Sequence, residues 1–131
     1  KLQTLEYDYA NVLSLEDTIQ DLLINRPGLD AIITTSEKDT TLVAQRLIDL
    51  NKLYYNIIGY GDTPEILRYI DNGVIFGTVS ANHEQMGYEA VKALVDLKEG
   101  GRTSAYFTVD IQLITKENVA EILAAKEEAS E

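Results

Sequence analysis

The stretch Asn56–Asn82, NIIGYGDTPEILRYIDNGVIFGTVSAN, decides the fold of this 131-residue chain. It begins with an apolar run at 57–60 between polar residues and glycine, which is typical of a buried strand. A helix start is expected directly after this strand. Asp62 or Thr63 can accept hydrogen bonds from free backbone N–H groups, and Pro64 suits the first helical position because it has no N–H to satisfy.

The second half of this stretch predicts the end of the helix and a further strand. Asn72-Gly73 ends the helix, because glycine tolerates the left-handed conformation that commonly follows a last turn. A second apolar strand is then expected at Val74–Val79. In open α/β sheets, ligands bind where turns leave the C-terminal ends of the strands. Any small-molecule site should therefore include Gly61 and Asp62.

Strands and helices alternate through the rest of the chain. Apolar periodicity predicts strands at 2–9, 30–35 and 105–114, and helices at 14–25, 39–51, 83–98 and from 119 onward. The strand at 105–114 alternates apolar with polar residues, as an edge strand with one wet face does. The charged tail 126–131 is expected to fray. The sequence predicts one α/β domain over residues 1–131, a three-layer open, mostly parallel sheet with helices on both faces.

Composition excludes several classes of function. The net charge of −11 would repel nucleic acid and anionic membrane surfaces, so neither is expected as a partner. Without cysteine there is no disulfide, thiolate metal site or cysteine nucleophile. His83 is the single histidine, which excludes a multi-histidine metal cluster. Gly59-Tyr60-Gly61 lacks the third glycine of a phosphate-binding loop. We expect no cofactor and no enzymatic activity.

Polar turns follow three of the predicted strands. In a parallel sheet, the turns 36–39, 61–63 and 80–83 gather along one edge, where they suit a polyhydroxylated or amide-bearing ligand. Tyr60 can stack on a sugar or an aromatic ligand; packing at the margin of the sheet with its hydroxyl in water is the alternative. Helix capping explains each turn equally well in isolation; their shared location favours a binding site. The candidate ligand-binding residues are Ser36, Glu37, Tyr60, Gly61, Asp62 and Asn82.

Three segments resemble a known family: DAIITTSEKDTTLVAQRL, IIGYGDTPEILRYIDNGVIFGTVSANHEQMGYEAVKALVDLKEGG and VDIQLITKENV. They are similar to the second lobe of type I periplasmic sugar-binding proteins, the extracytoplasmic receptors that feed ABC transporters. These receptors are related to the effector domains of LacI-type repressors. The resemblance extends from about Leu2 to Val119. It rests on DTPE after a glycine-aromatic turn, on MGYEAV and on the closing LITKENV.

The resemblance implies two lobes joined by chain crossings and closing on a small polar, carbohydrate-like ligand. This chain would be a fragment comprising the C-terminal lobe, with crossing segments near 78–82 and 105–115. Helix 83–98 would pack on the missing N-terminal lobe, so self-association of the fragment is a further expectation. The implied location is extracytoplasmic, either periplasmic or on the cell surface through a lipoprotein anchor. The implied partner is a membrane permease or a sensor protein.

Three of the family's usual sugar anchors are replaced in this chain. Ser36-Glu37 stands where these receptors usually have Asn-Asp, Gly61 where they have aspartate, and Ala81 where they have glutamine. Each lost hydrogen bond to a buried ligand hydroxyl costs about 1–3 kcal/mol. A solute-binding lobe therefore competes with a degenerate-pocket module that contacts a membrane sensor kinase. An effector lobe of a LacI-type regulator and a small enzyme of flavodoxin-like fold are the remaining alternatives, without a visible DNA-binding segment or catalytic set.

Overall fold

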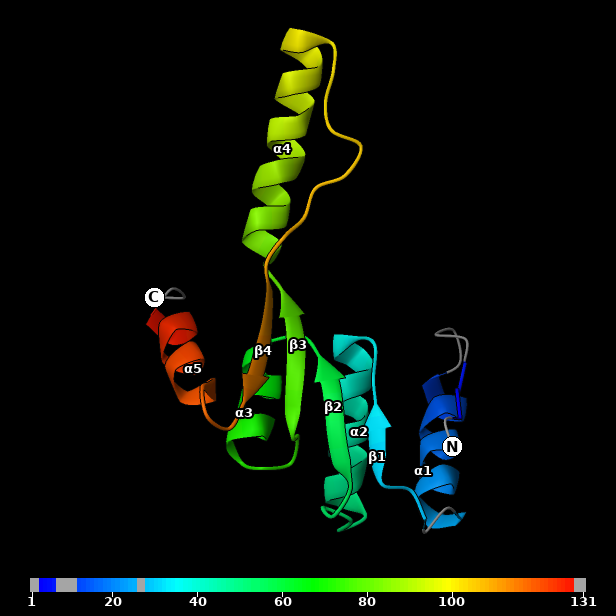
Figure 1. Cartoon of the computed structure of the whole chain (residues 1–131). Coiled ribbons are helices and arrows are strands. Elements are labelled where there is room, and N and C mark those ends of the chain that lie inside the picture. Colours follow the sequence, from blue (N-terminus) through cyan, green and yellow to red (C-terminus); the bar gives the residue numbers. More distant parts are fainter. Residues whose placement is uncertain (1–2, 7–11, 26–27, 129–131) are drawn as a thin grey trace.

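The computed structural model describes residues 3–6, 12–25 and 28–128. Helices and strands alternate along the chain, as Figure 1 shows. They are α1 (Val12–Asn25), β1 (Ala31–Ile33), α2 (Glu37–Asp49), β2 (Asn56–Tyr60), α3 (Pro64–Asp71), β3 (Gly77–Ala81), α4 (His83–Gly100), β4 (Ile111–Thr115) and α5 (Val119–Glu128).

The strands form one sheet in the order β1-β2-β3-β4. The first three are parallel, and β4 pairs antiparallel with β3. This confirms the mostly parallel sheet and the edge position of the last strand. Because β1, β2 and β3 are neighbours and point the same way, their C-terminal ends meet at one edge of the sheet.

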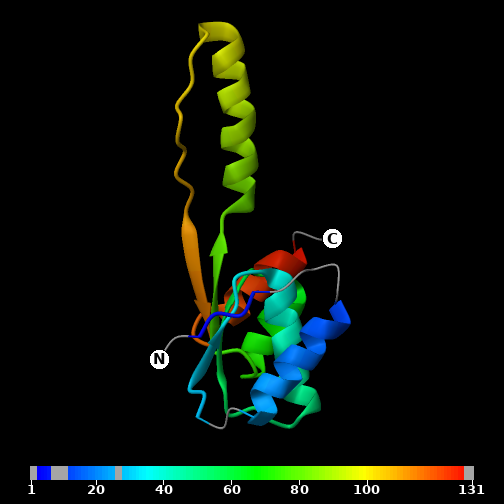
Figure 2. The same ribbon diagram turned by 90° about the vertical axis from the view of Figure 1, so that its right-hand side faces the viewer.

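Helices α1, α2, α3 and α5 all lie on the same side of the sheet, with α1 beside α2 (Figure 2). Between these helices and the sheet lies a core of aliphatic side chains. Its fully buried members include Leu23, Leu47, Ile57, Ile66, Leu67, Ile70, Ile114 and Val119. Burial of such side chains contributes roughly 1.5–3 kcal/mol each, so this layer supplies most of the stabilisation of the lobe.

The opposite face of the sheet is apolar and open. Ile33 pairs with Ile58 and Val79 with Leu113 on this face. Ile33 is 65% exposed, and Ile58 and Leu113 are exposed as well. The second helical layer expected on this face is not found among the described residues.

Several predicted strand boundaries were wrong, because backbone amides there bond outside the sheet or have no neighbouring strand to pair with. The strand expected at Val74–Val79 begins three residues later, since the Val74 and Ile75 amides donate to the carbonyl of Tyr69. Residues 105–110 form no strand, because β3 offers partners only as far as Ala81, opposite Ile111. Of the strand expected at 2–9, residues 3–6 are not strand, and the others lie outside the described residues.

The helix starts shift for a similar reason. Helix α2 begins at Glu37, two residues before the predicted start, because the Ser36 hydroxyl accepts the Asp39 amide. Helix α1 begins at Val12, two residues before the predicted start at residue 14. The first part of the charged tail is helical, since α5 continues to Glu128.

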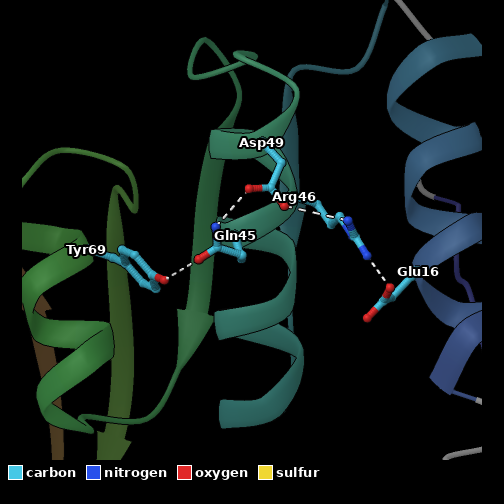
Figure 3. A network of polar contacts seen from close by, with 5 residues as sticks. All are labelled: Glu16, Gln45, Arg46, Asp49 and Tyr69. Atoms are coloured by element: carbon cyan, nitrogen blue, oxygen red, sulfur yellow. Dashed lines mark hydrogen bonds and ion pairs between the residues drawn. The ribbon is translucent and has the colours of Figure 1, made fainter.

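A polar network joins the outer surfaces of three helices (Figure 3). Arg46 of α2 pairs with Glu16 of α1 and lies 3.5 Å from Asp49. On the other side, the Tyr69 hydroxyl of α3 donates to Gln45 at 3.0 Å. Burial, together with a hydrogen bond to Glu65, raises the pKa of Tyr69. The network fixes the order α1-α2-α3 across the helical layer.

Helix α4 leaves the sheet as an arm, with residues 101–110 running back beside it (Figures 1 and 2). None of its 18 residues is buried. Its exposed apolar side chains are Met86, Tyr88, Val91, Leu94, Val95 and Leu97. Within the described part of the chain, no helix is long and apolar enough to cross a membrane. Exposed apolar side chains in this number are typical of surfaces that contact other proteins.

We expect the double substitution Val91→Glu and Leu94→Glu to leave the thermal midpoint nearly unchanged and to reduce self-association. Leu94 is 67% exposed, so its replacement removes little burial, and exposed substitutions usually change stability by less than about 0.5 kcal/mol. Sedimentation velocity over a concentration series measures the association. Lys92→Glu, also exposed on α4, is the control for added negative charge. A large drop in the thermal midpoint would show that the arm packs within its own chain.

Candidate functional site

Three polar turns lie side by side at the C-terminal edge of the sheet. They follow β1, β2 and β3, which are adjacent parallel strands. Each turn also begins a helix: Ser36 caps α2, Thr63 caps α3 and Asn82 caps α4. The edge predicted from the order of strands and turns is therefore present.

A buried hydroxyl ties the first two turns together. The Thr40 Oγ1 atom lies 2.8 Å from the Thr34 hydroxyl and 2.7 Å from the Ser36 carbonyl oxygen, to which it donates. It also accepts the Tyr60 amide at 3.0 Å. Thr40 is fully buried, so these bonds are shielded from water. One side chain of α2 thus fixes the C-terminal ends of β1 and β2.

The side chain of Glu37 lies directly over Gly61. A Cβ atom built on Gly61 would meet Cγ of Glu37 at 2.2 Å and its Oε1 at 2.7 Å. Gly61 also has a φ of +101°, outside the range that L side chains favour. Among the described residues, no hydrogen bond or ion pair is found for the Glu37 carboxylate. The space that a side chain at position 61 would fill is occupied by a half-buried carboxylate from the neighbouring turn.

Asp62 does not cap α3; its carboxylate pairs with Lys126 of α5. The Nζ atom of Lys126 lies 2.8 Å from Asp62 Oδ2 and donates to the Asp62 backbone carbonyl at 2.9 Å. Of the two capping residues considered from the sequence, Thr63 is the one used, and it accepts the Ile66 amide at 3.3 Å. The carboxylate of the β2–α3 turn is therefore neutralised from the end of the chain.

Asn82 stands where the chain passes from β3 into the arm. Its Oδ1 atom accepts the Gln85 amide at 2.9 Å, and its own amide donates to the Asp110 carbonyl at 2.9 Å. The Asp110 amide in turn donates to Oε1 of Gln85 at 2.8 Å. The base of the arm is thus closed by backbone and side-chain bonds together.

A depression of about 540 Å³ lies beside this base. Asp62 and Asn82 are the two predicted site residues that line it, while Ser36, Glu37, Tyr60 and Gly61 lie outside its lining. Its other lining residues are Ser80, Ala81, His83, Glu84, Asp110, Ile111, Gln112 and Lys126. Three acidic residues and one lysine are therefore among the residues that line it. Among the described residues, no group of three or more potential ligands is placed to hold a metal ion.

A second depression, of about 360 Å³, lies at the opposite end of the sheet. Tyr55, Phe76 and Lys116 are among its lining residues. It adjoins the start of β3 and the end of β4. It shares no residue with the predicted site.

Lys126, Asp110 and Gln112 were missed as site residues from the sequence. For Lys126 a signal was present, because it continues the spacing of Val119 and Ile122 along the inward face of α5. A lysine on a packing stripe needs a partner for its charge. For Gln112 the pairing with Ser80 across β3 and β4 brings it to the depression.

An open, mostly parallel sheet with polar turns at the C-terminal ends of its strands defines a class of ligand-binding α/β lobes. The sequence profile of the periplasmic binding protein domain matches residues 6–102. The chain belongs to this family.

Two relatives and one solved complex illustrate the likeness. The ribose import binding protein RbsB of Escherichia coli is 21% identical over 110 residues, covering 84% of this chain and 37% of its own. GanP, a glucose-galactose binding protein from Geobacillus stearothermophilus, is 26% identical with a TM-score of 0.72, over 79% of this chain and 37% of that one. A chain of the XylFII–LytSN complex is 28% identical with a TM-score of 0.68. The match covers 80% of this chain and 37% of that one. This chain therefore spans little more than a third of the relatives that it matches.

Proposed function

We propose that this chain is the C-terminal lobe of an extracytoplasmic receptor that binds a small polyhydroxylated solute. The observation that carries the proposal is the gathering of three polar turns at the C-terminal edge of adjacent parallel strands, in a chain of the periplasmic binding protein family. The site comprises Ser36 and Glu37 from the first turn, Tyr60–Asp62 from the second, and Asn82 from the third.

The arm supports a two-lobed receptor. The chain leaves the sheet at 78–82 and returns through 105–115, and these segments are the proposed crossings between the lobes. Helix α4 buries none of its residues within this chain, as expected for a helix that packs on the other lobe. Residues 1–131 would then form a single lobe, whose cleft is completed by the missing N-terminal lobe. A membrane permease is the proposed recipient of the solute.

The charges at this edge favour a neutral ligand. Glu37 presents a half-buried carboxylate, and Asp62, Glu84 and Asp110 line the depression beside it. Carboxylate oxygens accept hydrogen bonds from hydroxyl groups and repel phosphate or carboxylate groups. A sugar or cyclic polyol satisfies these acceptors, and a phosphorylated sugar does not.

A second candidate function is that of a sensing lobe with a reduced pocket. Three of the site's polar side chains already have partners within the chain. Ser36 and Asn82 cap helices, and Asp62 pairs with Lys126. The likeness to a chain of the XylFII–LytSN complex also fits a lobe that contacts another protein. On this proposal the exposed apolar arm or edge contacts a sensor domain.

The test is a titration of the ¹⁵N-labelled 131-residue chain with D-ribose, D-galactose and myo-inositol, followed by amide chemical shifts. The proposal expects saturable shifts at 36–37, 60–62 and 82 with at least one of them. Ribose 5-phosphate is the control, and the carboxylates should weaken its binding. Absence of shifts with every sugar, together with capture of a sensor domain by this chain, would replace solute binding by the sensing function.

A further inference from the structure

The ion pair between α5 and the β2–α3 turn involves a lysine outside the segments that resemble the family. Lys126 lies beyond residues 6–102, which match the family profile. Its ammonium bonds both the carboxylate and the backbone carbonyl of Asp62, at 2.8 and 2.9 Å. One lysine therefore restrains the side chain and the main chain of the same turn residue.

The geometry leaves one donor of this ammonium without a protein partner. A lysine ammonium has three N–H groups. Two of them serve Asp62, and no further partner of Lys126 is found among the described residues. The side chain of Lys126 is 39% exposed and lines the depression together with Asn82 and Gln112. The free donor thus belongs to a residue on the wall of the depression.

We propose that Lys126 positions the ligand-binding turn and offers its third N–H to an oxygen of the bound solute. This inference rests on the proposed function, because it concerns the same edge of the sheet. The remaining oxygen of Asp62 is the matching acceptor. A hydroxyl group both donates and accepts, so the Lys126–Asp62 pair recognises a hydroxyl of a neutral polyol. In an acceptor-rich depression, Lys126 supplies the cationic donor of the ligand contact.

The chain provides a matched pair at the other end of the sheet. Lys116 bonds both the carboxylate and the backbone carbonyl of Asp71, in the same manner as Lys126 bonds Asp62. It lines the second depression, away from the three polar turns. If the Lys126–Asp62 ion pair has only a structural role, removing either lysine should have the same effect on stability and no effect on sugar binding.

The experiment compares Lys126→Met with Lys116→Met in the 131-residue chain. Methionine keeps the apolar stem and removes the charge and its donors. Amide hydrogen exchange at 61–63 measures the restraint on the turn, urea unfolding measures global stability, and the sugar titration measures affinity. We expect Lys126→Met to accelerate exchange at 61–63 severalfold and to weaken sugar binding about tenfold or more, since hydrogen bonds to charged groups are the stronger ones. Lys116→Met should change neither the exchange rates at 61–63 nor the affinity for sugar.

Lys126→Arg should largely restore the slow exchange at 61–63 and the affinity for sugar, because arginine keeps the charge and several donors. Unchanged exchange at 61–63 in Lys126→Met would overturn the positioning role. Equal sugar affinity of Lys126→Met and the unsubstituted chain would overturn the ligand contact, and so would an equal loss in Lys116→Met. If the unsubstituted chain binds no sugar, this lobe does not hold a solute without the second lobe, and the ligand contact fails for the lobe alone. Hydrogen exchange still decides the positioning role in that case.

Discussion

Gly61→Ala should lower the free energy of unfolding by about 3 kcal/mol. Two costs add at this position. A φ of +101° strains any L side chain, and the new methyl group would collide with Cγ of Glu37, which lies 2.2 Å from its ideal position. Urea unfolding followed by circular dichroism measures the change.

A double-mutant cycle separates the collision from the backbone strain. Glu37→Ala removes the colliding atoms, so the pair Gly61→Ala and Glu37→Ala should be less destabilised than the sum of the single substitutions. Gly73 is the matched control for strain alone, because its φ is +75° and nothing lies within 4 Å of an added Cβ atom. Additive effects of positions 37 and 61 would show that Glu37 does not fill the space above Gly61.

Thr40→Val should cost about 3 kcal/mol, whereas Thr78→Val should be neutral or stabilising. Both threonines are fully buried, and valine has nearly the same shape. Loss of the Thr40 hydroxyl leaves the Tyr60 amide and the Thr34 hydroxyl without a partner. The Thr78 hydroxyl has no hydrogen-bond partner in the described structure, so a methyl group in its place removes only a desolvation cost.

Thermal and urea unfolding of both variants measure this contrast. If Thr40→Val unfolds at the same urea concentration as the unsubstituted chain, the hydroxyl does not hold the ends of β1 and β2. A loss in Thr78→Val would indicate a partner for that hydroxyl, such as a buried water molecule. Thr40→Ser is the control that keeps the hydroxyl while removing the methyl group.

Local patterns were sufficient for most of the fold. Thr63 and Pro64 start α3 as the sequence predicts, because caps depend only on neighbouring residues. The apolar stripe of α5, with Val119 fully buried, also follows from spacing alone. The apolar run at 74–76 misled the prediction of β3. Its first two amides bond to the end of α3 rather than to a neighbouring strand. The hydrophobicity of these residues does not indicate which of the two partners the amides take.

The candidate site depends on contacts between distant parts of the sequence, and these were predicted only in part. The order of strands placed the three turns at one edge. The pairing of Asp62 with Lys126 joins positions 64 residues apart. The collision that excludes a side chain at position 61 depends on the rotamer of Glu37 from another turn. The periodicity of a single sequence indicates which face of a helix or strand is buried. It does not indicate which distant side chains contact each other.

The base of the arm has a consequence for the order of folding. The β3–β4 pairing ends with Ala81 opposite Ile111, and the bond from the Asn82 amide to the Asp110 carbonyl closes it. Everything between these residues is an insertion in a β-hairpin, and the core beneath the sheet takes no side chain from α4. The lobe can therefore complete its core before α4 finds a partner surface. Folding of the sheet and assembly through the arm are separable events, and an arm shortened between Glu84 and Thr108 should still leave a folded lobe.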